Sequence, residues 1–160
     1  MSHELEMIDG VAQMAYAGET PWHGLGTKVS NDMSPVQMMQ KAGLDWTVSK
    51  VPSYVRVGDQ EIETGMEALV RSSDSKVLTQ VGGNWNPVQN EEAFEFFAEY
   101  VNAGDMEMHT AGSLKGGKMI WALAKIKESF DILGGDQVDS YLLFSNPHEY
   151  GKSIDVRFTP

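Results

Sequence analysis

Five residues between positions 112 and 127 combine positive charge with an aromatic ring, and they are Lys115, Lys118, Trp121, Lys125 and Lys127. The stretch that holds them contains no acidic residue, although the formal net charge of the chain is −11. Lysines neutralise phosphates and aromatic rings stack on bases, so this combination is typical of a surface that binds single-stranded nucleic acid. The alternative interpretation places Trp121 in the core and the lysines at solvated strand ends.

Two further stretches place aromatic residues beside Gly and Pro. They hold Trp22 with His23, and Trp85 with Asn86. Gly and Pro fix the backbone dihedral angles, and ordered loops of this kind often carry binding groups. We therefore expect these four residues at a functional surface, with no role assigned, or else as anchors of their loops. If the protein is an enzyme, His23 is the residue expected to act.

The segment from Gly112 to Lys118 has the spacing of a nucleotide-binding P-loop up to its lysine. A P-loop continues with a Ser or Thr whose hydroxyl binds Mg²⁺, and here the next residue is Met119. We therefore favour a β-hairpin with two glycines at its tip. In that hairpin Trp121, Lys125 and Lys127 share one face of the second strand.

Other chemistry has little support in the sequence. The chain has no cysteine, which excludes disulfides, thiolate metal sites and a cysteine nucleophile. Its four histidines do not have the spacing of metal ligands, and no serine-hydrolase motif or recognisable pair of nuclease carboxylates occurs. The sequence therefore predicts no catalytic residue, no metal site and no cofactor.

The surrounding pattern predicts two helices and several strands. Ser34 and Pro35 start a helix that Gly43 ends, and Asn90 caps a second helix that ends near Gly104. Strands are predicted over residues 45–57, 66–71, 76–81, 106–114, 118–126, 138–144 and 153–158. This order predicts an α+β fold, an antiparallel β-sheet with two main helices packed on it.

The organisation of the chain follows from the same pattern. Residues 1–33 have no sustained periodicity and are predicted to form an irregular N-terminal arm, followed by the α+β domain over residues 34–160. Because the sequence ends directly after a predicted strand, we expect a truncated N-terminal part of a longer protein. No apolar run of about 18 residues and no secretory signal occurs, so we expect a soluble cytoplasmic protein with no membrane partner.

The segment from Gly18 to Thr27 resembles the N-terminal signature of the phage/plasmid-like protein family, a domain of unknown function found in bacteriophages, prophages and plasmids. The resemblance continues at residues 42–46, 87–97, 110–114, 121–124, 146 and 156–160. It implies a mobile-element origin and a bacterial host cytoplasm. Members of the family are usually longer, and the resemblance supplies no catalytic residue.

Three hypotheses for function remain. The first is a phage- or plasmid-encoded accessory protein of DNA metabolism that binds or anneals single-stranded DNA through the lysine-rich strand. The second is an acidic protein-binding module that mimics DNA and engages a host protein, as the net charge favours. The third is an enzyme that uses the His23 loop. The oligomeric state stays open.

Overall fold

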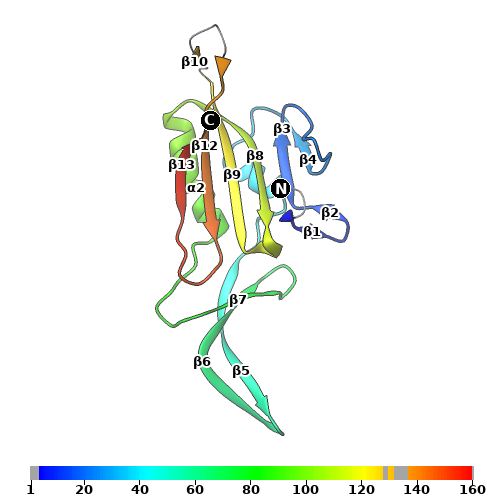
Figure 1. Cartoon of the computed structure of the whole chain (residues 1–160), viewed down its shortest axis with the longest axis vertical. Helices are drawn as coiled ribbons and strands as arrows, with labels where there is room; N and C mark the ends of the chain where they lie inside the picture. Colours follow the sequence, from blue (N-terminus) through cyan, green and yellow to red (C-terminus); the bar gives the residue numbers. More distant parts are fainter. Residues whose placement is uncertain (1–3, 128–129, 132–136, 160) are drawn as a thin grey trace.

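The computed structural model describes residues 4–127, 130–131 and 137–159 (Figure 1). Its helices are α1 (Pro35–Lys41) and α2 (Asn90–Ala103), with a short 3₁₀ turn η2 (Lys115–Gly117). The strands are β1 (Met7–Ile8), β2 (Val11–Ala12), β3 (Met14–Ala17), β4 (Thr27–Val29), β5 (Val48–Val57), β6 (Gln60–Arg71), β7 (Val77–Val81), β8 (Met106–Leu114), β9 (Met119–Ile126), β10 (Phe130–Asp131), β11 (Gln137–Val138), β12 (Tyr141–Pro147) and β13 (Asp155–Thr159). The predicted α+β class is confirmed. No described helix is long and apolar enough to cross a membrane.

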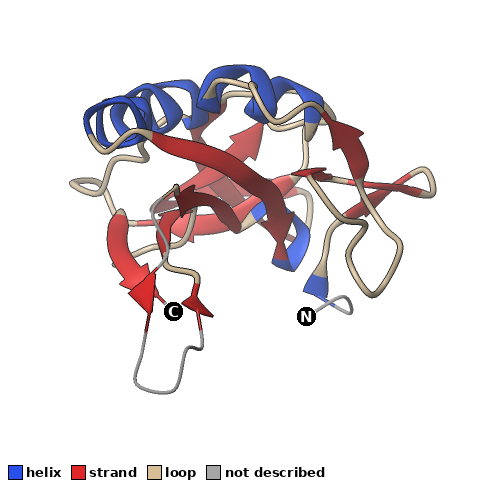
Figure 2. Ribbon diagram, turned by 90° about the horizontal axis from the view of Figure 1, so that it is seen from above, coloured by secondary structure: helices blue, strands red, loops and turns tan. Residues whose placement is uncertain are grey.

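A six-stranded sheet forms the body of the molecule, in the order β13-β12-β9-β8-β3-β4. Neighbouring strands in this sheet pair antiparallel, except that β3 and β4 pair parallel. Both helices lie on one face of this sheet, as Figure 2 shows. A separate three-stranded sheet, β5-β6-β7, projects from one end of the body as a long arm (Figure 1).

Strand β9 shows how the sequence builds the two faces of the sheet. Ile120, Ala122 and Ala124 are buried beneath the helices, whereas Trp121 and Lys125 alternate with them and lie on the opposite face. This is the alternation predicted for the second strand of the hairpin, and it is the period-2 pattern of a pleated strand. The helices bury an aromatic stripe against the sheet, so the amphipathic pattern of α2 fixes the main core.

The helix starts show one confirmed prediction and one that was wrong. Ser34 caps α1, and its side chain exchanges hydrogen bonds with Gln37 in a capping box. Asn90 was predicted to cap α2, but the N-cap is Gln89, whose amide instead bonds the backbone N–H and C=O of Val48 at 2.9 and 2.8 Å. Asn90 is the first helical residue, and its buried side chain points into the core.

The expectation of an irregular arm over residues 1–33 was also wrong in its local structure. Strand β3 is buried along its whole length and pairs with β8 inside the main sheet. Four side chains of this region form a second core on the face opposite the helices, and they are Leu5, Ala12, Met14 and Tyr16. Strands of two to four residues are too short to show a period, so the sequence pattern misses them. The domain boundary at residue 33 stays a prediction.

The β8–β9 connection settles the P-loop question in favour of a hairpin, since a strand follows Lys118. Its turn is η2, in which Lys115, Gly116 and Gly117 all have positive φ, at 54, 66 and 98°. A side chain at position 117 would approach Nη1 of the buried Arg71 at 2.7 Å, so this glycine is required by packing as well as by its backbone conformation.

Candidate functional site

The five residues of the predicted nucleic-acid surface do not form one surface. Lys115 and Lys118 lie at the turn end of the β8–β9 hairpin, whereas Lys125 and Lys127 lie at its other end. Lys125 follows Lys118 by seven positions, almost all of them in β9, which corresponds to roughly 23 Å along an extended strand. The structure therefore divides the predicted lysines into two pairs.

The pair at the far end is neutralised by carboxylates from neighbouring segments. Lys125 lies 3.4 Å from Asp139, and Lys127 lies 3.1 Å from Asp105. The stretch from 112 to 127 lacks acidic residues in the sequence, but folding brings acidic residues to it. These two lysines therefore lie beside exposed carboxylates, and their binding to phosphates stays a prediction.

Trp121 has a packing role. It is half-buried and contacts the second core, and a Cβ at Gly112 would lie 2.9 Å from its ring. This glycine lies directly opposite Trp121 on β8, so the bare backbone makes room for the indole. The arrangement matches the interpretation of Trp121 as a core residue. Stacking on a base stays a prediction.

Trp85 and Asn86 anchor the loop between β7 and α2. The indole Nε1 of Trp85 donates to the backbone oxygen of Lys152 at 3.2 Å, and its ring packs against the main core. The side-chain oxygen of Asn86 accepts a hydrogen bond from Lys50 Nζ at 3.4 Å. Both contacts account for these residues as loop anchors.

Trp22 and His23 lie in the loop between β3 and β4. The backbone N–H of Leu25 donates to His23 Nδ1 at 3.0 Å, and the two aromatic rings meet edge to face at 5.3 Å. Trp22 is 84% exposed, in contrast to the other predicted tryptophans. This loop is ordered by its own contacts and presents its largest side chain to solvent.

A buried ion pair, which the sequence did not predict, joins the body of the molecule to the three-stranded sheet β5-β6-β7. Arg71, only 1% exposed, donates from Nη1 to both carboxylate oxygens of Glu6 at 2.8 Å and from Nη2 to Asp74 at 2.7 Å. Ser113 donates to the same Glu6 at 2.9 Å. The hydrogen bonds from Arg71 lower the pKa of Asp74 to about 2. We call this ion-pair network, together with the hydrogen-bonded residues around Asn90, the buried junction.

The second half of the buried junction surrounds Asn90. Its side-chain oxygen contacts His148 Nε2 at 2.8 Å and accepts from Asn146 Nδ2 at 3.2 Å, while its amide donates to Leu44 O at 2.9 Å. Burial lowers the pKa of His148 to about 4, so this imidazole is neutral at pH 7. Asn90 and Asn146 belong to the segments that carry the family resemblance, and here they hold the fold together.

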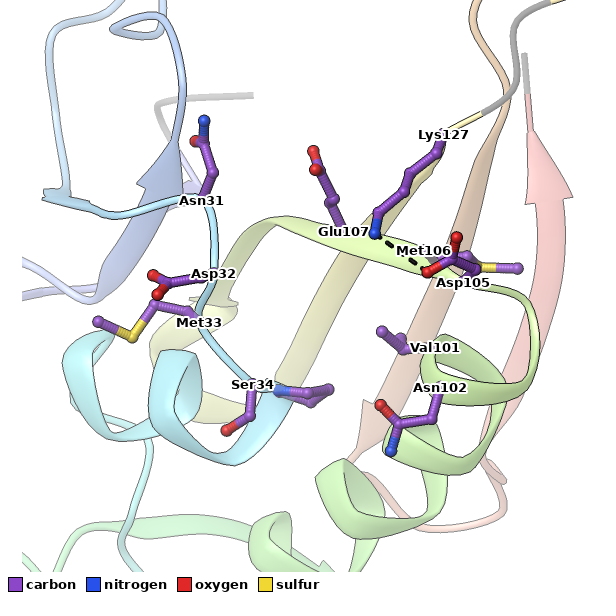
Figure 3. A pocket seen from close by; sticks show the side chains of 11 residues that line it. Asn31, Asp32, Met33, Ser34, Val101, Asn102, Asp105, Met106, Glu107 and Lys127 are labelled. Carbon is purple, nitrogen blue, oxygen red and sulfur yellow. Dashed lines mark hydrogen bonds and ion pairs between the residues drawn. The ribbon is translucent and has the colours of Figure 1, made fainter.

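Two cavities lie at the end of the six-stranded sheet opposite the buried junction. They have volumes of about 490 and 440 Å³ and share Asn31 and Glu107 in their walls. Figure 3 shows the first cavity, with Asn31 and Asp32 on one side and Glu107, Asp105 and Lys127 on the other. The second is lined by Ala17, Gly18, Glu19, Asn31, Glu107, Met108, His109, Lys125, Asp139 and Tyr141. We call the two cavities together the acidic groove.

The ionisable groups of the acidic groove are unbalanced in sign. Its walls contain five carboxylates and two lysines, and the carboxylates are Glu19, Asp32, Asp105, Glu107 and Asp139. Within the described part of the chain, no ion pair involves Glu19 or Glu107. The formal charge of the groove is therefore −3 when its histidine is neutral.

That histidine is His109, which sits at a β-bulge and meets the Tyr141 ring edge to face at 5.4 Å. Burial, and next the nearby Lys125 charge, lower its pKa below the ordinary value, so it adds no positive charge at pH 7. Its Nδ1 is buried and has no hydrogen-bond partner among the described residues. The groove thus offers carboxylates to a cationic group.

A metal ion has less support here, because the described residues contain no group of three or more His, Asp or Glu side chains placed to hold one.

Glu19, Glu107 and Asp139 come from a loop, a strand and a loop that are distant in sequence, and strand register alone brings them together. Sequence spacing therefore gave no signal for the groove.

The protein is thus an α+β protein with an acidic groove at one end of its main sheet. The family described as "Domain of unknown function (DUF932)" matches residues 77–160, from the start of β7 onward, and the protein belongs to this family. Comparison with curated proteins and with solved structures gave no match.

Proposed function

We propose that this protein is an acidic protein-binding module whose groove receives a lysine- or arginine-rich segment of a partner protein. The observation that carries the proposal is the acidic groove, in which five carboxylates face two lysines that are already paired with two of them. A basic side chain entering the groove meets Glu19 and Glu107, which lack a described ion-pair partner.

The size and the field of the groove support a peptide ligand. Each cavity falls within the range of about 300–1,000 Å³ that is usual for ligand sites. The net charge of −11 attracts a basic partner over distances near the Debye length, which raises the rate of encounter.

The family resemblance suggests a setting for this function. In a phage- or plasmid-derived protein acting in the cytoplasm of a bacterial host, a host DNA-binding protein is a suitable partner. Its basic segment normally meets phosphates, and the groove offers carboxylates in their place.

The test is fluorescence anisotropy with fluorescein-labelled hexalysine across a salt series. The double variant Asp105→Asn with Glu107→Gln removes two negative charges from the groove, and Asn tolerates the φ of 50° at position 105. We expect roughly tenfold weaker binding for this variant at low salt. Binding equal to that of the unmodified protein would contradict the proposal.

A matched control separates the groove from general charge. Glu61→Gln with Glu63→Gln removes the same two charges from the exposed hairpin of β5 and β6. We expect less than a threefold change for this control, because distant exposed charges are screened by salt. Equal losses in both double variants would assign the binding to net charge alone.

A second candidate keeps the nucleic-acid hypothesis at a different place. Lys76 Nζ donates to the backbone oxygen of Gly116 at 3.0 Å, which brings it to the turn that also holds Lys115 and Lys118. Among the described residues none of these three lysines has an ion-pair partner, so they can meet phosphates. An accessory protein of DNA metabolism would bind single-stranded DNA here.

Variants of the two lysine pairs distinguish this nucleic-acid site at the β8–β9 turn from the site that the sequence predicted along β9. Binding of a labelled single-stranded oligonucleotide should fall on Lys115→Glu with Lys118→Glu and persist on Lys125→Glu with Lys127→Glu. Loss only in the second variant would restore the far end of β9 as the site. No binding by the unmodified protein at low salt would remove the candidate.

A further inference from the structure

Trp22 differs from the other three tryptophans of the chain because its ring belongs to neither hydrophobic core and contacts the neighbouring His23 ring. Trp46 is buried between His148 and the guanidinium of Arg71, and Trp85 and Trp121 pack against the two cores. Trp22 is 84% exposed. Exposing an indole to water is costly, and Trp is among the residues most enriched where a partner binds.

The loop around Trp22 is ordered before any partner arrives. The N–H of Gly24 donates to Pro21 O at 2.9 Å, and the N–H of Leu25 donates to His23 Nδ1 at 3.0 Å. Leu25 itself packs against the second core and ties the loop to the body. A loop held in this way loses little backbone conformational entropy on binding.

The position of Trp22 links it to the acidic groove. Glu19, which lines the second cavity, precedes Trp22 by three residues. Three residues of chain span at most about 11 Å, so a single long side chain or a short peptide can contact both. The indole of Trp22 and the carboxylate of Glu19 are therefore close enough along the chain for one ligand to reach both.

We propose that Trp22 stacks on an arginine guanidinium of the basic segment that the groove binds, an inference that rests on the proposed function. A guanidinium is planar and more weakly hydrated than an ammonium, so it stacks on an indole face while its N–H groups reach a carboxylate. The combination of Trp22 with Glu19 therefore selects arginine over lysine.

The experiment compares fluorescein-labelled hexaarginine and hexalysine on Trp22→Ala, Trp22→Phe and the Asp105→Asn, Glu107→Gln double variant. We expect Trp22→Ala to weaken hexaarginine binding roughly tenfold and hexalysine binding less than threefold. Trp22→Phe, which keeps an aromatic face, should recover part of the loss. The melting temperature of Trp22→Ala should stay unchanged because the ring packs on no core residue.

The outcomes separate the two proposals. If Trp22→Ala leaves hexaarginine binding intact while the groove variant weakens it, Trp22 is not the anchor and the groove proposal stands. Equal losses for both peptides on Trp22→Ala would overturn the selection of arginine. If neither variant changes binding, both proposals fail.

Discussion

The two ends of the six-stranded sheet use polar residues in opposite ways. At the end that joins the three-stranded sheet, the buried junction encloses two bonded pairs, Arg71 with Glu6 and Asn90 with His148. At the other end, the acidic groove leaves its carboxylates open to solvent. Both ends combine residues from distant parts of the chain.

The comparison separates residues that hold the fold from residues that are free to bind. Leaving a buried polar group without its partner costs free energy, so a substitution in the buried junction should lower the free energy of unfolding. An exposed carboxylate contributes little to stability. Residues of the family-like segments fall on both sides of this division, with Asn90 and Asn146 inside and Trp22 outside.

The largest expected effect comes from breaking the ion pair of the junction. Arg71→Met leaves the Glu6 carboxylate buried with Ser113 as its remaining side-chain partner, so we expect a loss of about 3–5 kcal/mol in the free energy of unfolding. Urea denaturation followed by circular dichroism measures it. Adding Glu6→Gln should restore part of the loss, and a loss below about 1 kcal/mol would show that the pair is dispensable.

A smaller effect follows from the titration of His148. Its pKa is lowered to about 4 in the folded state from 6.5, so below pH 6.5 the unfolded chain binds the proton first. The stability is full above pH 6.5 and falls by about 3 kcal/mol as the pH drops to 4, since one pKa unit corresponds to about 1.4 kcal/mol.

Denaturation at pH 7, 6, 5 and 4 tests this dependence against His148→Gln, which cannot titrate in that range. The variant should be less stable at pH 7 but show a flatter profile between pH 6.5 and 4. Asp74 adds its own loss only at lower pH, between 3.8 and about 2. Parallel profiles for the two proteins would mean that another group governs the loss.

The smallest expected effect sharpens the contrast at the groove. Asp105→Asn with Glu107→Gln should change the free energy of unfolding by less than about 0.5 kcal/mol, because both side chains are exposed and the Asp105–Lys127 ion pair is on the surface. The measurement is the same urea titration. A loss as large as that of Arg71→Met would make the groove part of the scaffold.

Local patterns predicted the helices, the faces of β9 and the fold class. Ser34 with Pro35 marked one helix, and apolar residues spaced as in Phe94, Phe97 and Val101 marked the other. These signals depend on neighbours within one or two turns, which a sequence displays directly. The position of Asn90 was off by one residue because its side chain serves tertiary contacts.

The buried junction and the acidic groove could not be predicted because both depend on long-range register. Glu6 meets Arg71 from 65 residues away and Ser113 from 107 residues away. In the same way, Lys125 and Lys127 stand in a stretch free of acidic residues and meet Asp139 and Asp105 from adjacent segments. The charges next to these lysines in the sequence therefore do not predict the charges next to them in the fold.

A ¹H–¹⁵N NMR titration of the protein with hexaarginine at low salt tests directly whether the acidic groove binds a basic peptide. We expect shifts confined to the amides of the groove and its loop, led by Glu19, Asn31, Asp105 and Glu107, together with the indole N–H of Trp22. Shifts centred on the Lys115–Lys118 turn, or scattered evenly over the acidic surface, would contradict this expectation.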